Sequence, residues 1–192
     1  YSSLSDKASS KPLVSRKLRM KSTLIFLTTL LVISCGKPVD LDEAENRFQA
    51  NASLYEKLTN MAKEDFNGKS CYSVGTDNIG KYWESSGKWS HSQDYKTKMD
   101  INQVLEKVGI VQDKYSKYLE LFRETGSERV TYCPPSNFYI MAHRSGLAVS
   151  GCLLEIVKGV LPPPAYGKRN NGEDFMEIRK LKEGWWMEFK CT

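Results

Sequence analysis

The last part of the chain, Phe175–Cys191, reads FMEIRKLKEGWWMEFKC and has the pattern of a β-hairpin. Two runs that alternate between apolar and charged residues flank Glu183-Gly184, which is a turn signal. With Lys182 facing Trp185, opposite charges meet on one face and apolar residues meet on the other. The expected pairs are Arg179 with Glu188, Glu177 with Lys190, Ile178 with Phe189, and Met176 with Cys191. A slip of one residue would remove both sets of pairs, so the pattern predicts a single register.

A second hairpin is predicted upstream of the first. Phe138–Arg144 and Leu147–Val157 flank Ser145-Gly146, which has the composition of a two-residue turn. In this register Arg144 lies opposite Leu147, and one face carries apolar residues throughout. The residues on this predicted core face are Phe138, Ile140, Ala142, Leu147, Val149 and Leu153. A short strand at Arg129–Cys133 precedes the hairpin, and residues 165–173 are predicted to form a loop.

Two amphipathic helices are predicted before these strands. Apolar residues recur every three or four positions from Asp42 to Phe66, and again from Asp100 to Thr125. Asp40 or Asp42 can cap the first helix with its side-chain oxygen. Gly109 predicts a break in the second helical stretch, because glycine weakens a helix interior.

The stretch between the helices, residues 71–99, has no regular period and is predicted to be an irregular loop rich in aromatic residues. Ser85-Ser86-Gly87 can turn a short hairpin within it. The aromatic residues have two interpretations. In the first they cover the core from a long loop, and in the second Tyr82, Trp83 and Trp89 bind a glycan or a peptide.

The order of these elements predicts an α+β fold. We expect two amphipathic helices packed on one face of an antiparallel sheet of about five strands. Residues 42–192 are expected to form a single globular domain, since they contain enough residues and apolar side chains for one packed core.

The N-terminal part of the chain has a different character. Lys21 is followed by an apolar run, Leu24–Ile33. A helix that spans a bilayer needs roughly 20 apolar residues, so this run is too short to be one. A basic start, a short apolar run and a small residue are typical of a secretory signal peptide. The four residues Val32-Ile33-Ser34-Cys35 resemble the lipobox of bacterial lipoproteins.

The resemblance implies a lipid anchor at Cys35. In that family the cysteine thiol receives a diacylglyceryl group, and the signal peptide is then cut just before the cysteine. We therefore expect residues 20–34 to be the signal peptide, residues 35–41 a lipidated tether, and residues 1–19 an upstream extension or basic leader. The alternative is an apolar helix that contains a buried cysteine by chance. Two or three acyl chains hold a protein on a bilayer far better than one.

The same resemblance suggests a location. Gly36 stands beside Cys35 where such lipoproteins carry an aspartate when they stay in the inner membrane. We therefore expect the outer membrane, with the domain on the periplasmic side. The alternative is the outer face of the inner, cytoplasmic membrane.

The charge and the cysteines of the predicted mature chain limit its partners and its compartment. Six of the 28 Lys and Arg residues and one of the 23 acidic residues precede Cys35, which leaves 22 of each in the mature chain. A neutral mature chain does not favour nucleic acid as a partner.

Four further cysteines, Cys71, Cys133, Cys152 and Cys191, are candidates for two disulfides, and three connectivities are possible. Buried free thiols are the alternative.

No motif for catalysis, metal or cofactor binding is present in the sequence. The two histidines, His91 and His143, have no metal-ligand spacing, and no nucleophile elbow surrounds any serine. We expect no metal and no cofactor. The function expected from this pattern is a protein-interaction module, or an inhibitor or immunity protein, that meets its partner in the envelope. A glycan- or peptide-binding module is the alternative, and a hydrolase is a third possibility.

Overall fold

A computed structural model describes residues 39–66, 68, 70–135, 137–147, 150–159, 167–171 and 174–192. Residues Val39–Thr192 form one compact unit. The predicted leader, the predicted signal peptide and Cys35, the predicted lipidation site, lie outside the described residues.

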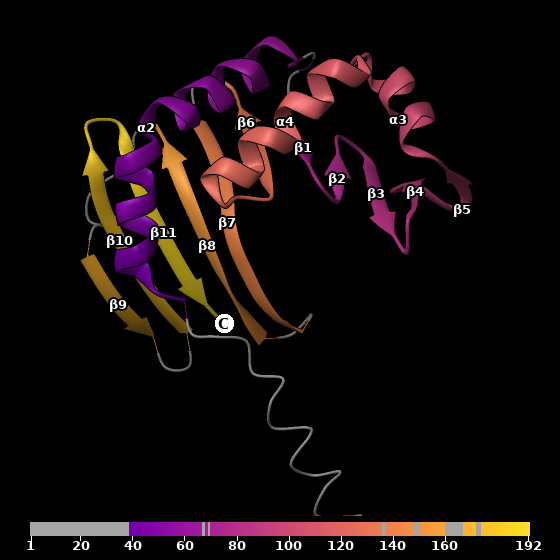
Figure 1. The fold of residues 1–192 in the computed structure, drawn as a ribbon. Helices are drawn as coiled ribbons and strands as arrows, with labels where there is room; N and C mark the ends of the chain where they lie inside the picture. Colours follow the sequence, from indigo (N-terminus) through magenta and orange to yellow (C-terminus); the bar gives the residue numbers. More distant parts are fainter. Residues whose placement is uncertain are drawn as a thin grey trace, which may run out of the picture. The chain divides into compact units, whose positions relative to one another are not determined.

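The described chain forms one large antiparallel sheet and three helices (Figure 1). The helices are α2 (Leu41–Glu64), α3 (Ile101–Val108) and α4 (Gln112–Thr125). The strands are β1 (Tyr72–Gly75), β2 (Asn78–Ile79), β3 (Tyr82–Ser85), β4 (Lys88–His91), β5 (Asp94–Met99), β6 (Arg129–Cys133), β7 (Asn137–Leu147), β8 (Ser150–Lys158), β9 (Gly167–Asn171), β10 (Asp174–Lys182) and β11 (Trp185–Cys191). Their spatial order is β5-β4-β3-β2-β1-β6-β7-β8-β11-β10-β9. None of the described helices is both long and apolar enough to cross a membrane.

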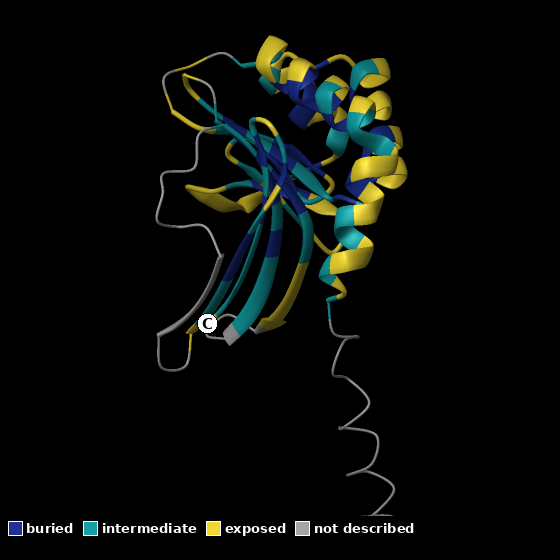
Figure 2. Ribbon diagram, turned by 90° about the vertical axis from the view of Figure 1, so that its left-hand side faces the viewer, coloured by how far each residue is buried: buried dark blue, intermediate teal, exposed yellow. Residues whose placement is uncertain are grey.

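The predicted α+β class is confirmed, but the predicted number of strands is wrong. The sheet has eleven strands in the described part of the chain, where about five were expected. Figure 2 shows the helices along one face of the sheet. The additional strands come mostly from residues 71–99, which were predicted to be a loop, and from β9 in the predicted loop 165–173. The additional strands are two to six residues long, and β5 is exposed at five of its six positions. Such strands show too little alternation of apolar and polar residues to be predicted from the sequence.

Two helix boundaries, at Asp40 and Gly109, follow the predicted signals, and the start of α3 has a cap that was not predicted. Asp40 caps α2, and its carboxylate accepts hydrogen bonds from the backbone N–H groups of Asp42 and Glu43 at 3.0 Å. Asp100 and Gln103 form a capping box at the start of α3. Gly109 ends α3 in the left-handed conformation, with φ of 75°, so the predicted break divides two separate helices.

The predicted register of the β7–β8 hairpin is wrong. Phe138 lies opposite Lys158 rather than Leu153, and the chain reverses between Leu147 and Ser150 rather than at Ser145-Gly146. Phe138 and Ile140 are buried as predicted, but their partner face in β8 is formed by Leu154 and Ile156. In the observed register β8 pairs with β7 along one edge and with β11 along the other. The register therefore depends on both neighbouring strands and not on the β7–β8 hairpin alone.

The β10–β11 hairpin begins in the predicted register and then shifts by one residue. Lys182 lies opposite Trp185 as predicted, but a bulge between Lys180 and Lys182 places Arg179 opposite Met187 instead of Glu188. The predicted cross-strand charge pairs are therefore wrong. Arg179 instead contacts Asp42 at 2.5 Å and Glu45 at 3.5 Å, both near the start of α2. The bulge thus directs this arginine to an acidic helix start, which its charge favours.

Both disulfides predicted from the cysteine count are present. Cys71–Cys133 joins the start of β1 to the end of β6, and Cys152–Cys191 joins β8 to β11. The structure thus selects one of the three possible connectivities. Each disulfide links neighbouring strands of the sheet and lies near an end of the strands that it joins.

The core lies between the helices and the sheet, and Trp185 is near its centre. The indole ring packs against Phe48 and Tyr55 of α2, and its Nε1–H donates to a Glu56 carboxylate oxygen at 2.9 Å. Lys158 and Lys182 lie over the same ring and also pair with Glu56. Glu56 therefore links α2 to two lysines and a tryptophan of the sheet.

These contacts make Glu56 sensitive to acid. Burial opposes its ionisation, but hydrogen bonds from Lys158 and Trp185 and the lysine charges outweigh burial and hold its pKa below the usual value. A carboxyl with a lowered folded-state pKa stabilises the fold above its unfolded-state pKa, and this contribution is lost as the pH falls. We expect urea unfolding midpoints to fall more between about pH 5 and pH 3 in the wild type than in Glu56→Gln. The control, Glu120→Gln on the exposed face of α4, should keep the wild-type slope.

Candidate functional site

A pocket with a volume of about 460 Å³ lies where the end of α2, the β2–β3 turn, β4 and the end of α3 meet. We call it the basic pocket. The residues that line it are Asp65, Phe66, Gly68, Ser70, Cys71, Tyr72, Gly80, Lys81, Tyr82, His91, Lys107 and Val108. Its volume is within the range of pockets that hold small ligands, about 300–1,000 Å³.

The walls of the basic pocket are held by local geometry. The Cys71–Cys133 disulfide fixes the chain that leaves α2 to the adjacent strand β6. Gly80 turns the chain from β2 into β3 with φ of 55°, and a Cβ atom there would lie 2.8 Å from the Tyr72 ring. Only glycine allows this approach, which places Lys81 at the pocket. Tyr82 and His91 face each other across β3 and β4, with ring centroids 5.2 Å apart.

In the described part of the chain, the acidic side chain of the basic pocket is paired, whereas its two lysines are not. Its acidic lining residue, Asp65, forms an ion pair with Lys114 at 2.7 Å and accepts a hydrogen bond from the Tyr118 hydroxyl at 2.7 Å. Lys81 and Lys107 are exposed, and neither forms an ion pair within the described residues. The pocket therefore has two uncompensated positive charges.

Two tyrosines at the basic pocket stay neutral: Tyr72 lines it, and Tyr118 donates a hydrogen bond to its lining residue Asp65. Burial, with a smaller effect of the Asp65 charge, raises the pKa of Tyr72 to about 12. Burial also raises the pKa of Tyr118, and its hydrogen bond to Asp65 raises it further. The Tyr72 hydroxyl is buried and has no hydrogen-bond partner among the described residues. These phenols are therefore held as neutral donors at physiological pH.

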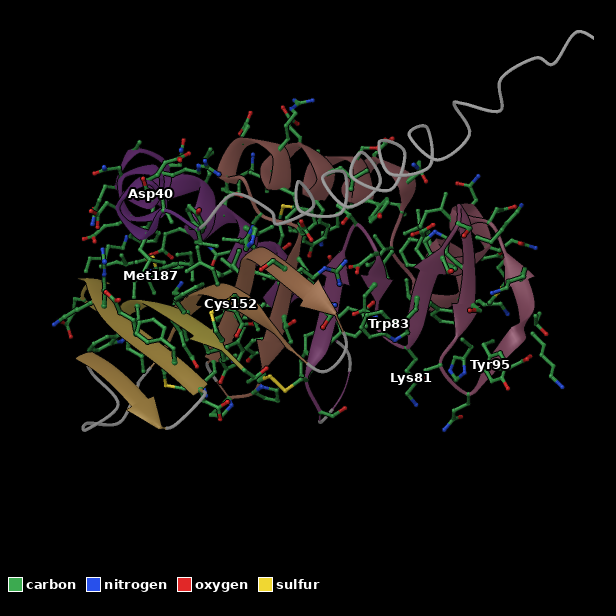
Figure 3. All side chains as sticks on the ribbon, turned by 90° about the horizontal axis from the view of Figure 1, so that it is seen from below. Asp40, Lys81, Trp83, Tyr95, Cys152 and Met187 are labelled. Atoms are coloured by element: carbon green, nitrogen blue, oxygen red, sulfur yellow. A yellow bond between two sulfur atoms is a disulfide. The ribbon has the colours of Figure 1, made fainter. Side chains whose placement is uncertain are left out.

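A second group of side chains lies around Trp83 of β3 and includes residues of β6, β7 and the β1–β2 turn. Successive residues of a strand point to opposite faces, so Trp83 points away from Tyr82 and its pocket. The Trp83 side chain is 44% exposed, and the Arg129 guanidinium lies 5.5 Å from its ring centroid. Asp77 pairs with Arg144 at 2.7 Å beside it. Figure 3 shows Lys81, Trp83 and Tyr95 at one end of the sheet, with Cys152 and Met187 in its other half.

The three aromatic residues proposed as ligand contacts do not lie together. Tyr82 lines the basic pocket, and Trp83 is exposed on the opposite face. Trp89 is only 5% exposed and belongs to the core. A single platform of three exposed rings is therefore not formed.

The two histidines lie in different surroundings. His91 lines the basic pocket, and its Nδ1 accepts a hydrogen bond from the backbone N–H of Gln93 at 3.2 Å. His143 lies beside the β7 bulge, and its buried Nε2 has no hydrogen-bond partner among the described residues. Among all the residues that the structure describes, no three His, Cys, Asp or Glu side chains are grouped so as to hold a metal.

Sequence reasoning found part of the basic pocket and missed the rest. Tyr82 was predicted as a possible ligand contact and His91 was given no role, whereas Asp65, Lys81 and Lys107 were not considered. These three are ordinary charged residues on a helix end, a turn and another helix end. No local pattern marks them, because the pocket exists only once four separate segments meet.

Comparisons with protein-family models, with curated proteins and with solved structures found no match for this chain. Inferences about its function therefore depend on the residues and the geometry described above.

Proposed function

We propose that this protein is a lipid-anchored binding module of the bacterial cell envelope. Cys35 carries the lipid, and the domain lies on the periplasmic side of the outer membrane. The domain binds an envelope protein, as an interaction module or as an inhibitor or immunity protein does. The basic pocket and the adjoining exposed surface at Lys81 are the docking site.

The basic pocket carries this proposal. It is the place in the described chain where concavity, uncompensated charge and aromatic side chains coincide. A second pocket, of about 390 Å³, lies at the joint between α3 and α4 and is lined mainly by apolar and amide residues. Glu106 is its charged lining residue, so it offers fewer groups for specific recognition.

The export features support the same proposal. Val32–Cys35 resembles a lipobox, and lipid attachment would place the domain next to a membrane. Two disulfides persist best in an oxidising compartment such as the periplasm. An anchored domain is confined near envelope proteins, which raises the effective concentration of any partner held in the same membrane.

Photo-crosslinking in the producing cell tests the proposal. Lys81→p-benzoylphenylalanine in the full chain is expected to give a crosslinked product with one envelope protein. Lys57→p-benzoylphenylalanine is the matched control, because Lys57 is also exposed but lies two turns before the pocket end of α2. Equal crosslinking from both positions would show that the contact is nonspecific and would contradict the proposed docking site.

The same cells test the anchor. Cys35→Ser is expected to abolish labelling with radioactive palmitate and to leave an unprocessed precursor. Since the domain is then no longer attached as in the mature protein, crosslinking from position 81 should also decrease strongly. Normal processing and unchanged lipid labelling of Cys35→Ser would refute the lipid anchor.

A further inference from the structure

We infer that the basic pocket recognises a carboxylate group of its ligand, an inference that rests on the proposed function as a binding module. The ligand chemistry follows from three properties of the pocket: its charge, its hydrogen-bond donors and the helix ends that line it.

The charge of the pocket favours an anion. Lys81 and Lys107 reach it from the β2–β3 turn and from the last turn of α3, and neither has an acidic partner within the described residues. The acidic lining residue Asp65 is already held by Lys114 and by the Tyr118 hydroxyl. A negative group that enters the pocket therefore meets two free ammonium groups and a carboxylate whose charge is compensated.

The donors of the pocket suit a carboxylate. Because Nδ1 of His91 accepts a hydrogen bond from Gln93, the proton of the neutral ring is on Nε2, which can donate. An ionised carboxylate accepts hydrogen bonds at both oxygens, and each lysine ammonium offers three donors. The rings of Tyr82 and Phe66 and the side chain of Val108 supply apolar surface for the remainder of the ligand.

The wall formed by α3 argues against a doubly charged phosphate. Lys107 and Val108 belong to the C-terminal end of this helix, where the helix dipole is negative. Asp65 and Phe66 lie at the C-terminal end of α2, whose dipole has the same sign there. Protein phosphate sites more often use helix N-termini or arginine forks. The pocket is lined by neither among the described residues. A singly charged group is the better match to two lysines opposed by the dipoles of both helices.

The carboxylate can come from the end of a peptide chain or from an acidic sugar, and two matched probe pairs distinguish these sources. The first pair is N-acetyl-trialanine with a free C-terminus and the same peptide as its C-terminal amide. The second pair is galacturonate and galactose. Titration calorimetry is performed on the complete purified chain with its disulfides intact. We expect the acid of one pair to bind at least tenfold more tightly than its neutral counterpart, and the pair that shows this difference identifies the source.

Variants then locate the binding site. Lys81→Ala and Lys107→Ala are each expected to weaken binding of the acid about threefold, and the double variant about tenfold, since exposed ion pairs contribute up to about 1 kcal/mol. Raising NaCl from about 0.05 M to about 0.5 M should also weaken binding, because salt screens exposed charges. Lys57→Ala, an exposed lysine outside the pocket, should bind as the wild type does. Circular dichroism verifies that each variant is folded.

Two results would overturn the inference: equal binding of acid and neutral probes in both pairs, or unchanged affinity in the double variant. These results are distinct from failure of the proposed function. Specific crosslinking from position 81 without any preference for acids would retain the binding module and remove its carboxylate specificity. Acid binding in vitro without lipid labelling or crosslinking in cells would remove the anchored, partner-binding role.

Discussion

Trp185→Ala is expected to lower the free energy of unfolding by about 3–5 kcal/mol, the usual cost of truncating a buried tryptophan. The Trp185 side chain is 1% exposed and packs against Phe48 and Tyr55. The variant loses these contacts and leaves a cavity between α2 and the sheet. It also removes the Nε1–H donor of Glu56, so a partly buried carboxylate loses one of its hydrogen bonds.

Urea unfolding under non-reducing conditions measures this loss. Trp83→Ala is the matched control, because it removes the same side chain from a position that is 44% exposed. We expect the control to lose no more than about 1 kcal/mol, mainly from its contact with Arg129. A similar loss in both variants would mean that Trp185 is not buried between α2 and the sheet.

Removing the Cys71–Cys133 disulfide by Cys71→Ala together with Cys133→Ala is expected to cost about 4 kcal/mol. The two cysteines are 62 positions apart, and loop-closure entropy predicts about this value for a loop of that size. The Cys152–Cys191 disulfide spans 39 positions and should cost nearly the same, about 4 kcal/mol. Denaturant titration of both double variants measures these losses.

The two disulfides should differ in their effect on binding. Cys71 lines the basic pocket, whereas Cys152 and Cys191 join β8 to β11 outside its lining. We therefore expect the Cys71→Ala, Cys133→Ala variant to lose affinity for the acidic probe, while the other double variant keeps it. Both titrations are made where each variant is still folded. Equal loss of binding in the two variants would show that general stability, and not the pocket wall, determines affinity.

The sequence predicted those features that depend on neighbours along the chain. Helix starts at Asp40 and Asp100 follow from side chains that bond to backbone N–H groups two or three residues later. The break at Gly109 follows from the conformational freedom of that one residue. The cysteine count predicted two disulfides but left their connectivity open, because pairing depends on which strands become neighbours.

Registers were less predictable, and the reason differs between the two hairpins. In β7–β8 the glycine at 146 suggested a turn, but pairing with β11 on the other side of β8 selects a later reversal. In β10–β11 the local charge pattern was consistent with a regular ladder. A bulge between Lys180 and Lys182 shifts the pairing by one residue, and Arg179 contacts Asp42, which is 137 residues away in the chain.

The amino-acid sequence alone determined the class of the fold, the helix limits, the likeness of Val32–Cys35 to a lipobox and the number of cysteines available for pairing. All of these depend on composition or on interactions within a few residues. The tertiary structure decided the strand registers, the disulfide partners, the burial of Trp89 and the existence of the basic pocket. Lys81, His91 and Lys107 become neighbours only when the sheet and α3 are assembled, because a pocket depends on contacts between segments that local chemistry does not encode.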